Sequence, residues 1–150
     1  MPLSGAARPA PNRGNEQILI GVDTNVLVRY LAQDDPVQSA GATRFFEQEI
    51  GPGTPGFVSA IVLCELIWVL EGAYGADRDA QAAVVERLLS VATLMVERPE
   101  ATARAVQVFR TSSADFADCL IAEIATASGC GETVTFDRAM ARLPGVRRLD

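Results

Sequence analysis

The sequence contains no histidine and no lysine, because all 13 of its basic residues are arginine. Without histidine the chain cannot form a Ser-His-Asp or Cys-His nucleophile pair, a His-ligated zinc site or an imidazole acid–base group. Without lysine it has no Walker A phosphate loop and no amine for a Schiff base. Any catalysis must therefore use carboxylates, thiols, hydroxyls, arginines or a bound metal.

The chain also lacks a long apolar run. The longest, residues 57–70, is shorter than the roughly 18 to 20 residues of a membrane helix and contains Glu65. Residues 1–16 are rich in Pro, Gly and Ala but have no continuous apolar core of the kind found in signal peptides. We therefore expect a flexible leader over residues 1–16, one domain over residues 17–150, a cytoplasmic location and no membrane contact.

Cysteine is scarce. The three cysteines, Cys64, Cys119 and Cys130, are odd in number, and two of them lie in apolar helical patterns. This usage predicts small buried hydrophobic side chains and no disulfide framework.

Short apolar segments alternate with helical patterns along the chain. The segments predicted as strands are 18–22, 57–58, 94–96, 133–136 and 146–149. The helical patterns cover 25–31, 37–50, 61–74, 78–91, 99–110 and 114–128. This alternation predicts an α/β sandwich in which helices cover both faces of a central parallel sheet.

Two acidic residues follow predicted strands directly. Asp23 comes after the segment ILIGV, and Asp137 comes after TVTF. Functional sites of open α/β sheets form beyond the carboxyl ends of the strands, so both positions suit a site. Capping of the following helix is the alternative explanation for each aspartate.

Glu65 lies in the helical pattern SAIVLCELIWVL, which has apolar residues on every side. We therefore expect a buried carboxylate, which is costly unless it is paired, protonated or bound to a metal. A structural ion pair with an arginine is the alternative, although the helix offers no arginine three or four residues away.

Asp115 and Asp118 are three residues apart in SADFADCLIAEIA, which places both carboxylates on one face of a helix. A cation would relieve their repulsion, whereas Asp115 could instead face solvent in the first helical turn. Carboxylates converging at strand ends and helix starts are the hard oxygen ligands that Mg²⁺ and Mn²⁺ prefer. Such ions activate water and stabilise the leaving oxygen of a phosphodiester.

Four segments in this order, GVDTNVLVRYL, VLCELIWVL, ADFADCLIAEIA and TVTFDRAMARLPGV, resemble PIN-domain proteins, specifically VapC-type toxins. The resemblance implies a three-layer α/β/α fold and a Mg²⁺- or Mn²⁺-dependent endoribonuclease that cuts structured RNA. It also implies a homodimer and a cognate VapB-like antitoxin. The residues that it implies as catalytic metal ligands are Asp23, Glu65, Asp118 and Asp137.

The resemblance also implies roles for residues beside these acids. Asp115 matches an additional acid of many relatives and is expected as a further metal ligand. Asn25 and Thr135 match polar positions that orient the acids.

A net charge of −6 argues against a broad basic surface for RNA. Two divalent ions would offset four of these charges, so a local arginine patch could still bind phosphate. Arg29 and Arg138 are the candidate RNA contacts, with solvated surface charge as the alternative.

Two other functions remain open. The first is a PIN-like binding or regulatory module that does not cleave, although the acids at all four positions count against it. The second is a carboxylate-metal phosphatase or DNA nuclease with the same site chemistry.

Overall fold

A computed structural model describes residues 18–150, so the leader expected over residues 1–16 lies outside the described residues. The helices are α1 (Thr24–Ala32), α2 (Pro36–Arg44), α3 (Ala60–Tyr74), α4 (Arg78–Ser90), α5 (Pro99–Arg110) and α6 (Phe116–Ala127). A short π-helix, η1 (Phe45–Glu49), extends α2, and a 3₁₀ turn, η2 (Met140–Arg142), lies near the C-terminus. The strands are β1 (Ile20–Gly21), β2 (Gly56–Val58), β3 (Leu94–Val96), β4 (Thr133–Thr135) and β5 (Val146–Arg148).

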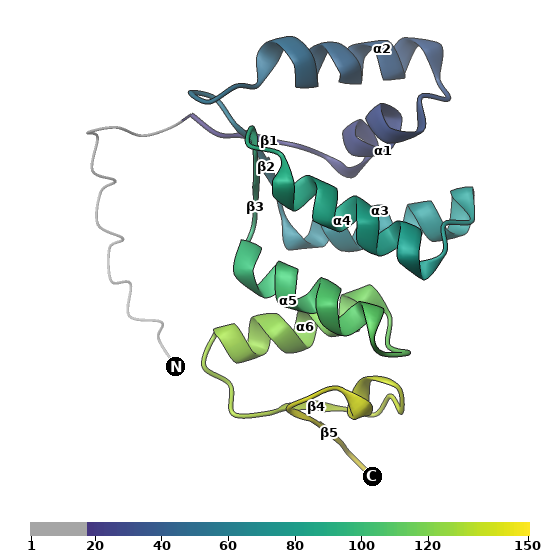
Figure 1. Cartoon of the computed structure of the whole chain (residues 1–150), viewed down its shortest axis with the longest axis vertical. Helices are drawn as coiled ribbons and strands as arrows, with labels where there is room; N and C mark the ends of the chain where they lie inside the picture. The colour runs from purple at the N-terminus through teal and green to yellow at the C-terminus, as the bar shows by residue number, and fades with distance from the viewer. Residues whose placement is uncertain (1–17) are drawn as a thin grey trace, which may run out of the picture.

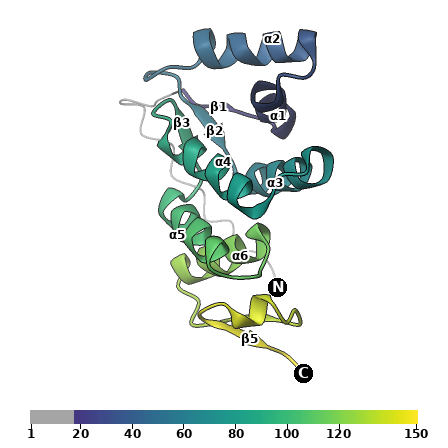
Figure 2. The same ribbon diagram turned by 45° about the vertical axis from the view of Figure 1, so that its right-hand side comes forward.

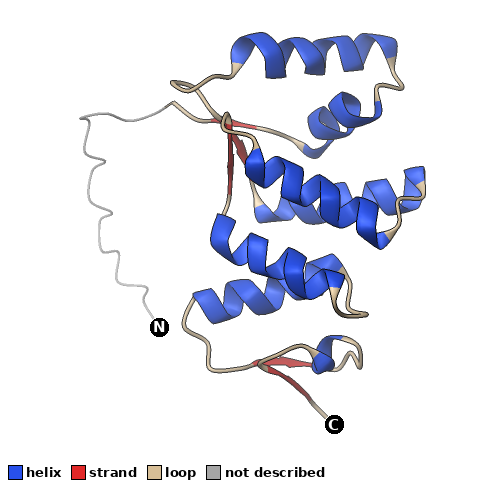
Figure 3. Ribbon diagram, viewed as in Figure 1, coloured by secondary structure: helices blue, strands red, loops and turns tan. Residues whose placement is uncertain are grey.

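All the strand pairs are parallel, which confirms the α/β class with a parallel sheet. The strands pair in two separate groups: a three-stranded sheet in the order β1-β2-β3, and a two-stranded sheet of β4 and β5. Figure 3 shows the two groups apart along the molecule, with α5 and α6 between them. The predicted central sheet is therefore present as two parallel parts.

The helix starts follow from side chains that accept hydrogen bonds from free backbone N–H groups. Asp23, Ser59, Asp77 and Asp115 occupy the N-caps of α1, α3, α4 and α6 and accept such bonds. At the other end of α3, Gly75 adopts a left-handed conformation with φ of 64°, which suits a residue without a side chain. These signals explain why the helices lie where the sequence predicts them.

The elements stack along the long axis of the molecule. In both views, α1 and α2 lie at one end, α3 and α4 are next, α5 and α6 follow, and β4 and β5 lie at the other end (Figures 1 and 2). None of the helices in the described part of the chain is long and apolar enough to cross a membrane.

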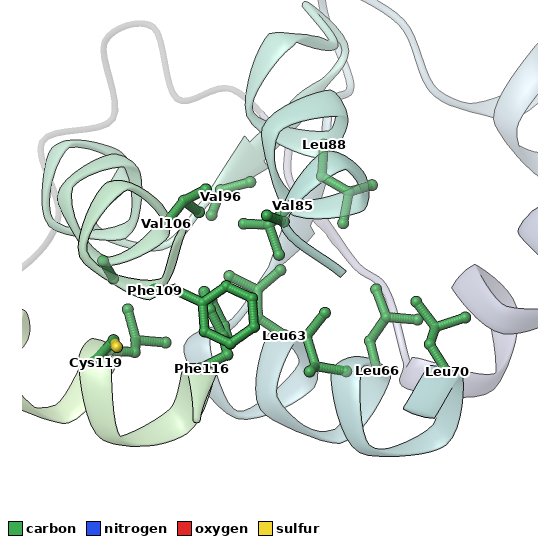
Figure 4. Close-up of a cluster of buried hydrophobic side chains, with 14 of the residues drawn as sticks. Leu63, Leu66, Leu70, Val85, Leu88, Val96, Val106, Phe109, Phe116 and Cys119 are labelled. Carbon is green, nitrogen blue, oxygen red and sulfur yellow. The ribbon is translucent and has the colours of Figure 1, made fainter. Parts of the chain in front are cut away.

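The central helices share one apolar core, in which Phe109 of α5 meets Phe116 of α6 edge to face at a centroid distance of 6.0 Å. Figure 4 shows this cluster. The residues that it labels from α3, α4, β3 and α6 are Leu63, Leu66, Leu70, Val85, Leu88, Val96 and Cys119. Packing of this kind fixes the start of α6 against α3 and α4.

The cysteines are all free. Cys119 is buried and Cys64 is half-buried, as expected for small hydrophobic side chains. Cys130 is exposed in the loop after α6, so the prediction of a buried side chain is wrong at this position. Helix α6 ends at Ala127, so Cys130 lies beyond the helical face that packs into the core.

Candidate active site

Asp23 and Glu65 are joined through Thr24. Asp23 follows β1, and its carboxylate caps α1 by accepting a hydrogen bond of 2.9 Å from the Thr24 backbone. The buried Thr24 hydroxyl donates to Glu65 Oε2 across 3.4 Å. Asp23 therefore caps α1, as its alternative explanation predicts. The same turn also links Asp23, through Thr24, to Glu65 of α3.

Glu65 is exposed, which corrects the expectation that its carboxylate is buried. Helix α3 buries Leu63, Leu66, Ile67 and Leu70, and this stripe packs into the core. Glu65 lies on the opposite face between Ile61 and Trp68, which are 71% and 58% exposed. Because the carboxylate is exposed, the cost of burying a charge gives no argument for a metal at this position. The observation that connects Glu65 to the other acids is its hydrogen bond from Thr24.

Asp115 and Asp118 lie together at the start of α6. Asp115 is the N-cap residue, and its Oδ1 accepts a bond of 3.0 Å from the Asp118 backbone. Burial, followed by the charges of Asp115 and Asp137, raises the pKa of Asp118 from 3.8 to about 6. A carboxyl that loses its proton reluctantly for these reasons marks a place where negative charge accumulates.

Asp137 belongs to this second group of acids. Its Oδ1 accepts a hydrogen bond of 2.7 Å from the Met140 backbone, and its own N–H donates to Thr135 Oγ1 across 3.0 Å. The Asp137 carboxylate therefore holds the turn that leads into η2, and Thr135 contacts the backbone of Asp137. Its charge acts on Asp118, so the two side chains are neighbours.

The acids thus form two groups, one with Asp23 and Glu65, the other with Asp115, Asp118 and Asp137. Burial and, secondarily, the charge of Asp115 raise the pKa of the Cys64 thiol, so Asp115 lies near the residue that precedes Glu65. Within residues 18–150 of one chain, no three acids or cysteines are placed to share a metal ion. The donors have the hard oxygen chemistry of a Mg²⁺ or Mn²⁺ site.

The residue that holds the start of α6 was not predicted from the sequence. Arg78, at the start of α4, donates through one guanidinium nitrogen to the carbonyl oxygens of Phe109, Ser112 and Ala114, at 2.6, 2.9 and 2.8 Å. Its guanidinium carbon also lies 3.9 Å from the centre of the Phe109 ring. These contacts fix the loop that leads into Asp115. From the sequence alone, an arginine at a helix start cannot be distinguished from a charged residue at the surface.

A third acid follows a strand and was also missed. Glu97 comes directly after β3, and its Oε1 accepts a bond of 3.1 Å from the Ala60 backbone at the start of α3. Glu97 therefore supports the helix that carries Glu65. The signal available in the sequence was the position of Glu97 directly after a predicted strand.

The predicted polar and basic neighbours of the acids lie in different surroundings. Asn25 is exposed and lines a pocket of about 410 Å³ between β1, α1 and α2, and no hydrogen bond from it to an acid is found among the described residues. Arg29 is held by Asp34 at 3.2 Å and by Gln38 at 2.7 Å. Arg138 is exposed beside Asp137, and no ion pair of its side chain is found in the described part of the chain.

Comparison with known proteins identifies the family of the chain. The PIN domain family model matches residues 20–146. A protein of Aquifex aeolicus (strain VF5) named VapC ribonuclease is 30% identical over 123 residues, which cover 81% of this chain and 90% of that protein. Both findings confirm the resemblance seen in the four sequence segments. The chain therefore belongs to the PIN domain family.

Proposed function

We propose that this protein is a Mg²⁺- or Mn²⁺-dependent endoribonuclease that cuts structured RNA as the toxin of a type II toxin–antitoxin pair. One observation carries the proposal: carboxylates follow β1 and β4, face solvent on α3 and begin α6. These acids are Asp23, Glu65, Asp118 and Asp137, with Asp115 beside them. The family membership and the printed name of the Aquifex aeolicus relative, VapC ribonuclease, support the same activity.

The metal is assigned to these carboxylates as ligands. When bound, Mg²⁺ or Mn²⁺ would supply activation of a water molecule and charge stabilisation, leaving a 5′-phosphate and a 3′-hydroxyl. The chain's own residues orient the acids: the Thr24 hydroxyl holds Glu65, and Thr135 Oγ1 holds the backbone of Asp137. Asp118, with a pKa of about 6, is largely ionised at neutral pH and can accept a cation.

A toxin of this kind requires partners. We propose a cognate VapB-like antitoxin that covers the carboxylates, a homodimer, and a cytoplasmic location, where translation takes place. Arg138 is the stronger candidate for a phosphate contact, because it is exposed beside Asp137, whereas Arg29 is engaged by Asp34 and Gln38. Asn25 remains a proposed orienting residue next to Asp23.

The test compares cleavage of a labelled stem–loop RNA, a DNA of the same sequence and a phosphomonoester, each with Mn²⁺, with Mg²⁺ and with EDTA. We expect metal-dependent cleavage of the RNA alone, and its loss in Asp23→Asn and Asp118→Asn. Asp77→Asn is the matched control, because Asp77 caps α4 through a bond of 2.8 Å but belongs to neither group of acids.

The outcome also separates the alternatives. Cleavage of DNA or of the phosphomonoester in preference to RNA would favour a DNA nuclease or a phosphatase. Binding of RNA without cleavage under every metal condition would favour a module that does not cleave. If Asp118→Asn retained the full Mn²⁺-dependent activity in a preparation free of contaminating nuclease, the assigned site would be wrong.

A further inference from the structure

Trp68 is a large apolar side chain that the core of the protein does not use. It is the one tryptophan of the chain, and it is 58% exposed on α3. It is not among the side chains that pack against the apolar core, and no aromatic or cation contact of its ring is found within residues 18–150. Tryptophan is well buried on average, so an exposed indole without a partner in its own chain indicates a contact with another molecule.

The solvent-facing stripe of α3 carries Trp68 and Glu65 together. Its exposed residues follow the helical period and are Ile61, Glu65, Trp68 and Gly72. The leucines of α3 that Figure 4 labels lie on the opposite stripe and point into the core. Residues three apart on a helix are neighbours, with their Cβ atoms about 5 to 6 Å apart. The indole therefore lies beside the carboxylate that the proposed function assigns to the metal.

Contacts of α3 bring Glu65 close to other acids of the proposed site. Helix α3 packs against both α1 and α6. The hydroxyl of Thr24, at the start of α1, donates to Glu65 Oε2 across 3.4 Å. The charge of Asp115, at the start of α6, reaches Cys64, the residue before Glu65. The carboxylates that begin α1 and α6 therefore approach the first half of α3, and Trp68 lies one helical turn further along.

A nucleic acid base is a suitable partner for an indole in this position. RNA whose phosphate lies at the carboxylates carries bases on both sides of that phosphate. Stacking of a base on an aromatic side chain strengthens binding by roughly 5- to 150-fold. The net charge of the chain is −6, so general attraction for phosphate is weak, and a stacking contact adds affinity that does not depend on charge.

Another protein surface is a poorer occupant of this position in the active form. A second copy of the chain that covered the ring of Trp68 would also cover Glu65, which must stay open to metal, water and RNA. The other aromatic residue of the helix, Tyr74, already has a partner, because its hydroxyl donates to Asp34 Oδ2 across 2.6 Å. Trp68 is therefore the aromatic side chain of α3 that is available to the substrate.

We infer that Trp68 is a stacking platform for an RNA base adjacent to the phosphate at Glu65. This inference rests on the proposed function for the identity of the substrate. A base must leave its own stack to lie flat on a side chain, so the contact selects an unpaired nucleotide. Every base has an aromatic face, so Trp68 contributes affinity for unpaired RNA and no preference for one base over another.

Fluorescence reports this contact directly, because Trp68 is the one tryptophan of the chain. The Asp118→Asn variant, chosen to prevent cleavage, is titrated in Mg²⁺ with an unstructured oligouridine and with an abasic ribose-phosphate oligomer of the same length. The oligouridine should quench the emission in proportion to the RNA bound, whereas the abasic oligomer should leave the emission unchanged. An emission that oligouridine leaves unchanged, at concentrations that saturate cleavage by the wild type, would overturn the inference.

Variants on the same stripe separate stacking from general apolar contact. In the Asp118→Asn background, Trp68→Ala should weaken binding of labelled oligouridine, measured by anisotropy, by about tenfold, and Trp68→Phe should weaken it less. Ile61→Ala is the matched control, because Ile61 is 71% exposed on the other side of Glu65 but has no aromatic ring. Equal losses in Trp68→Ala and Ile61→Ala would contradict a stacking contact. The melting temperature of Trp68→Ala should stay close to that of its parent, since the ring is exposed.

Dilution of the free protein tests the competing occupant. If the emission of Trp68 changed with protein concentration but not on addition of RNA, the indole would belong to a contact between copies, and the inference would be wrong. Wild-type protein that cleaves RNA while Trp68→Ala binds it unchanged would overturn this inference alone. Wild-type protein that cleaves no RNA with any metal would refute the proposed function, whereas quenching by the oligouridine would still support the base contact.

Discussion

The hydroxyl of Thr24 donates to Glu65 Oε2 across 3.4 Å and connects the first residue of α1 to the exposed face of α3. Thr24 is 5% exposed, so its hydroxyl has little access to water. Thr24 therefore orients the carboxylate of Glu65 although it is not acidic itself. Groups that hold metal ligands in this way are worth roughly tenfold to hundredfold in metal affinity or activity.

We predict that Thr24→Val lowers Mn²⁺-dependent RNA cleavage by about tenfold, because valine keeps the shape of threonine but cannot hold Glu65. Thr24→Ser should retain most of the activity, since serine keeps the hydroxyl. Both variants keep the backbone N–H that Asp23 caps, so their melting temperatures should stay close to each other. Equal activity of the valine and serine variants would show that the Thr24–Glu65 contact has no part in the reaction.

A second prediction concerns Arg78. Arg78→Met removes the donor shared by three carbonyl oxygens and should lower the free energy of unfolding by about 2 to 4 kcal/mol, since charged hydrogen bonds in a partly buried site are lost. Urea unfolding measures this change. Arg104→Met is the comparison, because Arg104 makes an exposed ion pair with Glu123 and should change stability by less than about 1 kcal/mol. Similar losses in the two variants would contradict the role given to Arg78.

Most of the secondary structure could be predicted from local signals. Aspartate and serine caps, Pro36 and Pro99 in the first helical turns, and Gly75 at a helix end each act within a few residues. The π-helix after α2 was missed, because its sequence gives no such signal. The division of the strands into two sheets was also missed, since strand pairing joins residues far apart in the chain.

The candidate site was predictable in part. Placement after a strand identified Asp23 and Asp137, because chain direction alone puts such residues at the carboxyl edge of a sheet. The environment of Glu65 was predicted incorrectly, since nearly every position of α3 is apolar and periodicity could not select the buried face. The contacts of Thr24 and Arg78 span 41 residues and 31 to 36 residues, respectively, so no local pattern shows them.

The two candidate RNA contacts should behave differently. Arg138→Gln should weaken binding of the stem–loop RNA and reduce the dependence of binding on salt by about one charge, because the exposed guanidinium beside Asp137 is free to meet phosphate. Arg29→Gln should have a smaller effect, since Arg29 already pairs with Asp34. Binding is measured in an Asp118→Asn background to prevent cleavage. A larger effect of Arg29→Gln would make Arg29, and not Arg138, the stronger candidate for an RNA contact.

The last prediction concerns pH. Because the pKa of Asp118 is raised from 3.8 to about 6 in the folded protein, the folded state binds more protons than the unfolded state between these values. The stability that Asp118 contributes is therefore full below about pH 4 and is lost as the pH rises through about 6. Asp34, Glu86 and Glu132 have lowered pKa values and act in the opposite direction, with stability lost as the pH falls.

The difference in melting temperature between the wild type and Asp118→Asn isolates the contribution of Asp118. In EDTA, the melting temperature of the wild type relative to this variant should fall from pH 4.5 to pH 7.5. Mn²⁺ should raise the wild-type value at pH 7.5 more than at pH 4.5, because a protonated carboxyl does not bind the ion. A difference that stays constant with pH in EDTA would mean that Asp118 titrates as an ordinary aspartate.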